Sequence, residues 1–482
     1  MSRLFKNTFI YTIGNILPQA VAFFLLPVFT QYLSPEEYGI VASMQVIQIL
    51  LAVFFSFGLE KAVVRLYWDY KTEAEQKVFL GTAVLAVFLI ALAVLGLVFI
   101  FRQLINLFFI DIAFEPYFTL TIFTTFLLAI TFLPKYYYRL KHKANIFLLI
   151  SMVELVLNTG LTLYFVISKN EAAEGVLKGK LISIVLLAPI FLYITIRNIR
   201  FVIDFKILKE CMKFSLPTIP ALFAAWSIGQ IDKVFIADYL SLSEVGIYGL
   251  SKRIGGLITI ISSSFMLAYH PLYFEIASTS DEQSRRKLFK YNNIFIIVII
   301  SFGFGLVLFS KELTFTFLDK RYWDTYKYFP FITLSLLISS ISSAIIGASF
   351  QQSKKMKEDM YFGFVGAAIN IFLCYVLIEP FGLYGAILGI FLSSLAIFVL
   401  TYVYTMKHCF FVPMNWGLIG TFLLVYISII SFFHFFIHFS IAATLIVKSF
   451  VLIILIFVIL YKYRNDLKAI FQKKNIDSNL TA

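Results

Sequence analysis

The sequence predicts an all-α polytopic membrane protein. This prediction rests on its composition and its hydropathy. Sixty per cent of the 482 residues are hydrophobic and only 14% are charged, and the mean hydropathy is +0.89. Soluble domains contain roughly 45–50% apolar and about 25% charged residues, so a soluble globular enzyme is excluded. A transmembrane helix needs roughly 20 apolar residues, and runs of that length recur along the whole chain.

Hydropathy divides the chain into about fourteen apolar segments, each long enough to cross a bilayer. Prolines within several of them predict kinked helices, which bundles in lipid tolerate. The expected spans are 8–33, 38–60, 78–101, 117–136, 146–168, 176–197, 214–238, 246–275, 291–310, 329–352, 362–379, 383–405, 417–439 and 441–461.

Charge patterning predicts how these spans are oriented. The chain has 40 Lys and Arg residues against 27 Asp and Glu, a net charge of +13. With fourteen spans, most of the Lys and Arg fall in the loops that share a side with both termini. The positive-inside rule therefore predicts that both termini are cytoplasmic, and it explains the positive charge without invoking nucleic acid.

A short motif occurs twice and points to a parallel repeat. The sequence YLSPEEYGI of 32–40 recurs as YLSLSEVGI in 239–247, with six of nine positions identical at an offset of 207. Each copy is expected to form the tight outside turn after the first helix of a six-helix block. Parallel repeats are typical of transporters whose substrate site lies between the halves. We therefore expect an N-terminal lobe over 1–205, a second over 206–406, and two extra helices with a basic cytoplasmic tail over 407–482.

Motifs for catalysis or cofactor binding are lacking. The segment GVLKGK of 175–180 has the wrong spacing for a P-loop, and neither a zincin nor a nucleophile-elbow motif occurs. The three cysteines are scattered, which predicts neither a disulfide framework nor a metal site. We expect no cofactor, no bound metal and no enzymatic activity.

The motifs together resemble those of the polysaccharide transporter family. A basic N-terminus leads into NTFIY and GN at 7–15, followed by the first repeated turn. A later stretch reads IDKVFI, EVGIY and KRI within 231–254. This pattern is similar to O-antigen and related lipid-linked oligosaccharide flippases, of the superfamily that also holds multidrug antiporters and the lipid II flippase.

The resemblance carries expectations about fold, substrate and surroundings. It implies two six-helix lobes around a cationic central cavity with alternating access. The implied substrate is an O-antigen-like oligosaccharide on undecaprenyl diphosphate, moved from the inner to the outer leaflet of the bacterial cytoplasmic membrane. Membrane lipids and the polymerase and glycosyltransferases of the same pathway are the implied partners.

Four charged residues near the second copy of the motif are the main candidates for substrate binding. Asp232 and Lys233 precede the turn, and Lys252 and Arg253 follow it at a matched depth of about 15 Å. Ionisable groups inside a membrane are costly and often functional. The surplus of positive charge favours binding of the substrate diphosphate, for which Arg is well suited. The alternative is an ion pair that joins two helices.

The offset of 207 shows that these charges are confined to the second half. The matched first-half positions hold uncharged residues, and pure structural pairing would more often recur in both halves. Those positions are Leu25, Leu26, Gln45 and Val46.

Two further intramembrane charges stand apart. Lys448 lies alone in the last predicted span, where it either reaches the cavity or extends toward a head group. Glu154 lies one turn before Asn158 in the fifth span, which suits either a proton or sodium coupling site or an interhelical contact. Asp232 is the second candidate for ion coupling.

Polar residues in the first two spans complete the candidates. Asn15, Gln19 and Gln45 are suited to sugar hydroxyls, with interhelical hydrogen bonds as the alternative. A cluster at the inner end of the second span is interpreted either as an inner gate or as positive-inside anchoring. Its members are Glu60, Lys61 and Arg65.

Other functions remain open. A cation-coupled multidrug-type antiporter would need an acidic cavity, and a lipid II flippase would share the fold. A membrane glycosyltransferase or polymerase would need a carboxylate-rich outside loop. The longest expected outside loop, 311–328, holds Asp319 and Asp324 but no paired-carboxylate motif, and four cations lie beside them.

Overall fold

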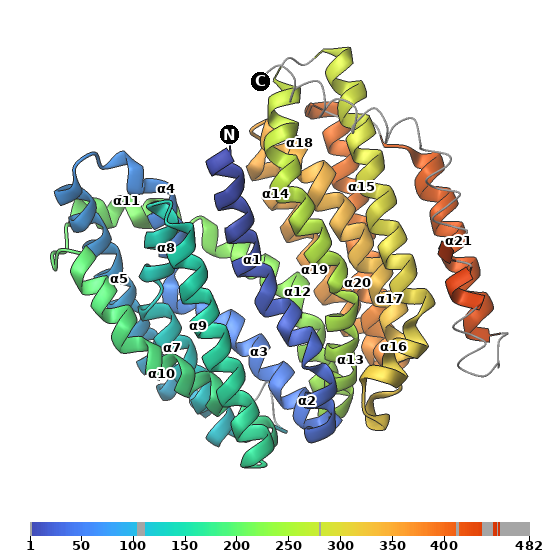
Figure 1. Ribbon diagram of the computed structural model, residues 1–482, viewed down its shortest axis with the longest axis horizontal. Coiled ribbons are helices and arrows are strands. Elements are labelled where there is room, and N and C mark those ends of the chain that lie inside the picture. The colour runs from blue at the N-terminus through green and yellow to red at the C-terminus, as the bar shows by residue number, and fades with distance from the viewer. Residues whose placement is uncertain are drawn as a thin grey trace. The chain divides into compact units, whose positions relative to one another are not determined.

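The computed structural model describes residues 2–103, 111–278, 281–410, 414–435, 447–450 and 452–453. Within these ranges every regular element is a helix (Figure 1). Ten helices are long and apolar enough to cross a membrane, and the number rises to twelve if two bent pairs each count as one span. The prediction of an all-α polytopic membrane protein is confirmed. The count of fourteen is not, since most of 436–461 lies outside the described residues.

Prolines bend or break the spans, as expected. The first predicted span consists of α1 (Ser2–Phe24) and α2 (Leu26–Tyr32), which meet at an angle of 44°. Pro27 lies in the first turn of α2, where its missing N–H costs least. Pro134 occupies the same position in α8 (Leu133–Leu140), so the fourth predicted span ends at a break and continues as a short separate helix.

The chain folds into two compact units, each built from two stretches of sequence. Unit 1 contains residues 1–249 and 367–389, and unit 2 contains residues 250–366 and 390–482. These units are spatial groupings that do not follow the expected boundaries after residues 205 and 406. The two-lobe repeat with two extra helices stays a prediction.

Unit 1 holds a bundle of long helices with short amphipathic helices at one end. In Figure 1 the short helices α4, α8 and α11 gather at the end of unit 1 where α1 begins, and α2 lies at the other end. Besides α1, α2 and α8, the unit contains α3 (Pro35–Ser56), α4 (Leu59–Leu66), α5 (Glu73–Ile100), α7 (Thr119–Ile130), α9 (Ala144–Leu163), α10 (Ala172–Asn198), α11 (Phe205–Ser215) and α12 (Thr218–Tyr239).

The short helices are fixed by a shared core. Leu59 and Val63 of α4 and Ile207 and Cys211 of α11 are buried in one cluster with Phe79 of α5. Spacings of four residues place each pair on one helix face. This packing fixes α4, and with it the residues that follow, against the ends of the long helices.

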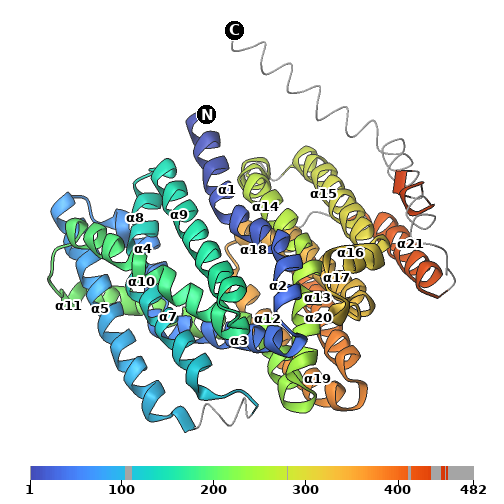
Figure 2. The same ribbon diagram turned by 60° about the horizontal axis from the view of Figure 1, so that its bottom comes forward.

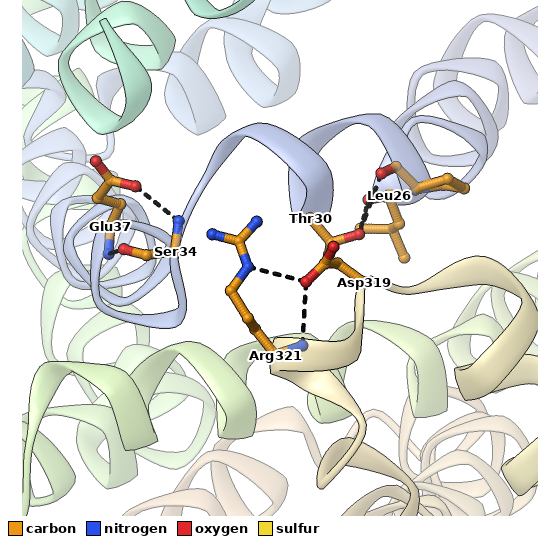
Figure 3. Close-up of polar contacts among 7 residues, drawn as sticks. Leu26, Thr30, Ser34, Glu37, Asp319 and Arg321 are labelled. Carbon is orange, nitrogen blue, oxygen red and sulfur yellow. Dashed lines mark hydrogen bonds and ion pairs between the residues drawn. The ribbon is translucent and has the colours of Figure 1, made fainter. Parts of the chain in front are cut away.

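The two copies of the repeated motif form the same helix–turn–helix in unit 1. The first joins α2 to α3, and the second joins α12 to α13 (Leu242–Gly255). In the first copy the Ser34 side chain accepts a hydrogen bond from the Glu37 amide, and Glu37 accepts one from the Ser34 amide (Figure 3). In the second copy Ser241 caps the Glu244 amide at 3.2 Å. The predicted turns are therefore present in both copies.

The glycines of the two copies bring the turns into direct contact. A Cβ at Gly39 would lie 1.8 Å from the carbonyl oxygen of Leu242, and one at Gly246 would lie 2.0 Å from that of Pro35. Only glycine permits such an approach of two backbones. The motif recurs at two places that touch one another.

Unit 2 has its own hydrophobic core. Its centre includes Phe295, Ile299 and Phe304, with Leu337 and Tyr426 packed from neighbouring helices. Its helices, seen from a second direction in Figure 2, are the end of α13, α14 (Leu257–Ala277), α15 (Glu282–Leu308), α16 (Ser310–Phe317), α17 (Thr325–Ile341), α18 (Gly347–Gln352) and α21 (Trp416–Phe435). The helices α19 (Met356–Phe381) and α20 (Leu383–His408) contribute to both units.

The loop between α16 and α17 is held locally. Asp319 accepts hydrogen bonds from the backbone amide of Arg321 and from its guanidinium at 2.8 Å (Figure 3). These hydrogen bonds lower the pKa of Asp319. The two predicted loop carboxylates are thus each engaged by a neighbouring cation, since Asp324 pairs with Lys327.

Candidate functional site

Two adjoining cavities occupy the α4 end of unit 1. The first, called here the polar cavity, has a volume of about 350 Å³. Its lining residues are Gly14, Pro18, Lys135, Tyr136, Arg139, Phe147, Ser151, Glu154, Leu155 and Asn158. The second, called the aromatic cavity, has a volume of about 300 Å³ and is lined by Tyr11, Val64, Trp68, Tyr136, Arg139, Leu140 and His142. Tyr136 and Arg139 belong to both.

The sequence of α8 explains why two cations enter the polar cavity. Pro134 cannot continue the hydrogen-bond ladder of α7, so a new helix begins at Leu133. Lys135 and Arg139 are four residues apart and lie on one face of this helix. A pair of basic side chains thus faces the space between α8, α9 and α1.

The polar cavity has one acidic side chain in its lining, and that side chain is paired. Glu154 of α9 forms an ion pair with Lys135, with the two side chains 25% and 37% exposed. One turn further along α9, the Asn158 carbonyl oxygen is buried without a hydrogen-bond partner among the described residues. A buried acceptor without a partner is costly, so this oxygen is available to a ligand.

Arg139 is the second cation that lines the polar cavity, and the acid of the lining, Glu154, is already paired with Lys135. The Arg139 side chain is exposed, and within the described part of the chain it takes part in no ion pair or hydrogen bond. A guanidinium presents five donors in a planar fork that fits a phosphate group. The arrangement therefore suits an anion with several oxygens.

The aromatic cavity has a different character. Trp68 is 48% exposed and stacks on His142, with ring centroids 6.3 Å apart and planes at 18°. The hydroxyl of Tyr11 is buried and makes no hydrogen bond with any described residue. Next to His142, Lys141 contacts the Tyr67 ring, and a hydrogen bond to Tyr67 raises the pKa of Lys141.

The structure places Glu154 in a polar site together with two cations. Sequence analysis proposed Glu154 for ion coupling and overlooked Lys135 and Arg139, which were counted as loop cations. The i, i+4 spacing after Pro134 is the signal that identifies them. Whether Glu154 couples transport to an ion stays a prediction.

Asp232 and Lys233 are both buried in unit 1. Asp232 is fully buried and accepts a hydrogen bond of 2.5 Å from the Tyr248 hydroxyl. The Lys233 ammonium donates to the Gln230 side chain at 3.0 Å. Lys252 and Arg253 belong to unit 2. Their joint role with Asp232 and Lys233 in diphosphate binding stays a prediction.

The residues expected at an inner gate differ in their surroundings. Glu60 lies close enough to Tyr136 to act on it electrostatically, and one Glu60 carboxylate oxygen is buried without a hydrogen bond to a described residue. Lys61 and Arg65 are exposed, and Arg65 lies 3.6 Å from Asp69. The gate itself stays a prediction.

The three polar residues proposed for sugar binding are less well placed. Gln19 and Gln45 are exposed, and neither lines the two cavities. The side chain of Asn15 lies outside the described residues. Their role in sugar binding stays a prediction.

Lys448 has a buried acidic partner, so it is not an isolated charge, and its role in substrate binding stays a prediction. Its ammonium lies 2.8 Å from both carboxylate oxygens of Glu312 in unit 2, and the side chains are 4% and 9% exposed. Glu312 was placed in a loop by hydropathy, so no sequence signal linked it to Lys448. Burial of a lysine requires such a partner.

The chain matches known proteins along most of its length. A family model described as polysaccharide biosynthesis protein matches residues 28–327. The chain belongs to this family of polysaccharide biosynthesis proteins. It is also 21% identical over 425 residues to an uncharacterized membrane protein of Methanocaldococcus jannaschii, covering 82% of this chain and 96% of that protein.

The fold of this chain is similar to that of solved membrane transporters. The lipid II flippase MurJ in an inward closed conformation aligns with a TM-score of 0.70 and 18% identity, covering 95% of this chain and 99% of MurJ. An inward-facing MATE family multidrug transporter of the MOP superfamily aligns with a TM-score of 0.62 and 15% identity, covering 81% and 94%. The predicted resemblance to the polysaccharide family is confirmed by the family model, the fold is shared with these transporters, and the chain is a multi-pass membrane protein.

Proposed function

We propose that this protein is a flippase that moves an undecaprenyl-diphosphate-linked oligosaccharide, such as an O-antigen unit, from the inner to the outer leaflet of a bacterial cytoplasmic membrane. The observation that carries the proposal is the polar cavity of unit 1, where Arg139 projects beside Lys135 from a short helix at the end of an apolar bundle. Membership of a polysaccharide biosynthesis family supports a saccharide cargo.

The chemistry of such a substrate fits the charges of the polar cavity. A diphosphate carries several anionic oxygens, and Arg139 offers donors that are not engaged by a described acid. Lys135 is held by Glu154, and a phosphate that competes for Lys135 releases the Glu154 carboxylate. Hydrogen bonds between these cations and a diphosphate are charge-assisted and therefore stronger than hydrogen bonds between neutral groups. The prenyl chain stays in the bilayer while the polar head passes through the protein.

Transport by this proposal is alternating access between two lobes, with both termini cytoplasmic. Lys252, Arg253 and Lys233 are proposed as further contacts of the diphosphate. Glu154 and Asp232 are proposed as the groups that couple movement to an ion gradient. The glycosyltransferases and polymerase of the same pathway would supply and consume the substrate.

A second candidate has the same substrate chemistry. The likeness to MurJ favours a lipid II flippase. Complementation of a strain depleted of its own lipid II flippase separates the two: growth supports lipid II as cargo, and lysis contradicts it. A multidrug-type antiporter is disfavoured, because the one acid that lines the polar cavity, Glu154, is neutralised by Lys135.

The test is a chromosomal deletion complemented by variants, followed by extraction of lipid-linked oligosaccharides and assignment of their leaflet. Deletion should accumulate an undecaprenyl-diphosphate glycan that faces the cytoplasm, with loss of surface polymer. Arg139→Gln should reduce surface polymer by about tenfold or more, the effect of losing one charged hydrogen bond of about 1.5–3 kcal/mol. Arg197→Gln, which removes an exposed arginine of α10 bonded to Tyr193, is the matched control and should be silent.

Two outcomes would contradict the proposal. If the pools of lipid-linked oligosaccharide and the surface glycan are both unchanged after deletion, the protein does not transport the proposed cargo. Equal polymer levels for Arg139→Gln and Arg197→Gln, at equal protein abundance in the membrane, would remove the polar cavity as the binding site.

A further inference from the structure

We infer that the aromatic cavity is a saccharide subsite, in which one pyranose ring of the cargo stacks on Trp68 while its hydroxyls bond to Tyr11 and Arg139. This inference rests on the proposed function and names the part of the protein that recognises the sugar next to the phosphate. The polar and aromatic cavities share Tyr136 and Arg139 and therefore adjoin, and the proposal has one ligand that contacts both.

The first argument is the chemistry of the lining. A pyranose ring has an apolar face of C–H groups and a rim of hydroxyls, so its site needs an aromatic face and a few polar groups at the edge. Trp68 offers the largest aromatic surface of the cavity and remains 48% exposed. Tyr136, His142 and Arg139 supply polar atoms around it. The polar cavity, by contrast, contains the charged pair.

The second argument is an unused hydroxyl. Tyr11 packs its ring edge-on against Phe147 at 5.2 Å, which holds the side chain in place. Its hydroxyl is buried and has no hydrogen-bond partner among the described residues, although it lines the cavity. A hydroxyl both donates and accepts, and burying it unpaired costs free energy. A sugar hydroxyl in the cavity would satisfy it.

The third argument is that Trp68 is held in position before any ligand arrives. Its neighbour Tyr67 is buried and donates a hydrogen bond of 2.6 Å to Gln76, and the Tyr67 ring contacts the indole edge-on at 5.1 Å. On the other side, His142 stacks on the indole from a turn in which its φ is +54°. A ring fixed in this way loses little conformational entropy on binding.

The size of the cavity limits what it accepts. About 300 Å³ lies at the lower end of the range of roughly 300–1,000 Å³ for small-molecule sites. The subsite therefore fits the sugar nearest the diphosphate and not a whole oligosaccharide. Specificity for the first sugar of the cargo would reside here, and the more distal sugars would be recognised weakly or elsewhere.

The experiment compares two synthetic probes that differ by one sugar, farnesyl diphosphate and glucosyl farnesyl diphosphate. Binding to the purified full-length protein in lipid nanodiscs is measured by calorimetry. Trp68→Ala should weaken binding of the glucosyl probe by about tenfold, the scale of one aromatic contact, and leave farnesyl diphosphate unchanged. Tyr11→Phe, which removes only the hydroxyl, should weaken the glucosyl probe by about fivefold. Arg139→Gln should weaken both probes.

Two further variants control for folding. Trp416→Ala removes a tryptophan of unit 2 that is 47% exposed, and it should not affect either probe. Trp68→Phe keeps an aromatic face and should retain most of the affinity for the glucosyl probe. The chain has four tryptophans, so the fluorescence of Trp68 is obtained by subtracting the fluorescence emission of the Trp68→Phe variant from that of the native protein. That difference should respond to the glucosyl probe and not to farnesyl diphosphate.

The outcomes distinguish this inference from the function on which it rests. If neither probe binds the native protein, the proposed function fails, and the subsite fails with it. If both probes bind but Trp68→Ala and Tyr11→Phe weaken them equally or not at all, the polar cavity stands and the saccharide subsite is overturned. The subsite is also overturned if the fluorescence of Trp68 does not change when the glucosyl probe is added. In that case Trp68 serves only to anchor the protein at the membrane interface.

Discussion

The two copies of the repeated turn in unit 1 share a backbone and differ in chemistry. Both have a serine cap, a glutamate three residues later and a glycine that meets the other copy. The helix before the second copy carries the buried Asp232, whereas Leu25 occupies the matched position before the first. The shared residues are those that shape the turn, and a buried carboxylate is among the residues that differ.

The difference shows how two copies of one turn can be preceded by helices of different charge. Backbone contacts between the copies require glycine in both, so that feature is kept in duplicate. A buried carboxylate needs a local donor, and Tyr248 supplies it in the second half. The residue at the matched position in the first half is Val41, which offers no donor. One half could therefore gain a charge while the turn itself was preserved.

Alanine at either glycine should produce the largest loss of stability. Gly39→Ala and Gly246→Ala each place a Cβ within 2.0 Å of a backbone oxygen, so the helices must separate. Overpacking of this kind costs about 1–3 kcal/mol or more. We expect similar losses for the two variants, measured as the midpoint of thermal unfolding in detergent, because each glycine faces the backbone of the other copy.

Gly160→Ala is the matched control for these variants. Gly160 lies within α9 with nothing within 4 Å of the position of its Cβ, so alanine there should be neutral or stabilise by up to about 1 kcal/mol. If Gly39→Ala unfolds at the same temperature as Gly160→Ala, the two copies do not touch as described.

A double-mutant cycle on Asp232 and Tyr248 should show the next largest effect. Asp232→Leu introduces the first-half residue and leaves the buried Tyr248 hydroxyl without this acceptor, at a cost of about 1–3 kcal/mol. Adding Tyr248→Phe should then cost little, because both partners of the hydrogen bond are gone. We expect a coupling energy of about 1 kcal/mol or more from unfolding midpoints. Additive effects would mean that the contact contributes nothing.

The same cycle separates structure from transport. If Asp232 serves only to hold Tyr248, the double variant should regain transport along with stability. If Asp232 couples transport to an ion, the double variant should be stable and inactive in the surface-polymer assay.

Much of the fold could be predicted from the sequence, because hydropathy reports burial in lipid directly. The long apolar spans, the breaks at Pro27 and Pro134 and the repeated turn were all visible in the sequence. The contact between Gly39 and Gly246 was not, since it joins residues 207 apart. Similar motifs show that two segments adopt the same shape and say nothing of whether they touch.

The candidate site was only partly predictable. Glu154 stood out because it interrupts an apolar span. Lys135 and Arg139 did not, because positive residues near a span end are expected at any cytoplasmic boundary. Trp68 and Tyr11 did not stand out either, because the chain contains 56 Phe, 27 Tyr and 4 Trp residues. The pairing of Lys448 with Glu312 joins residues 136 apart, so it required the tertiary structure.

The two serine caps should give the smallest and most discriminating difference between the copies. Ser34→Ala removes a reciprocal capping box and should cost about 1 kcal/mol. Ser241→Ala should cost less, since among the described contacts the Ser241 hydroxyl accepts one bond from the Glu244 amide, and the Ser241 amide donates none to the Glu244 carboxylate. Ser34→Asn keeps a capping side chain and should restore most of the stability. Equal unfolding midpoints for the two alanine variants would show that the turns are held by the contact between Gly39 and Gly246 rather than by their caps.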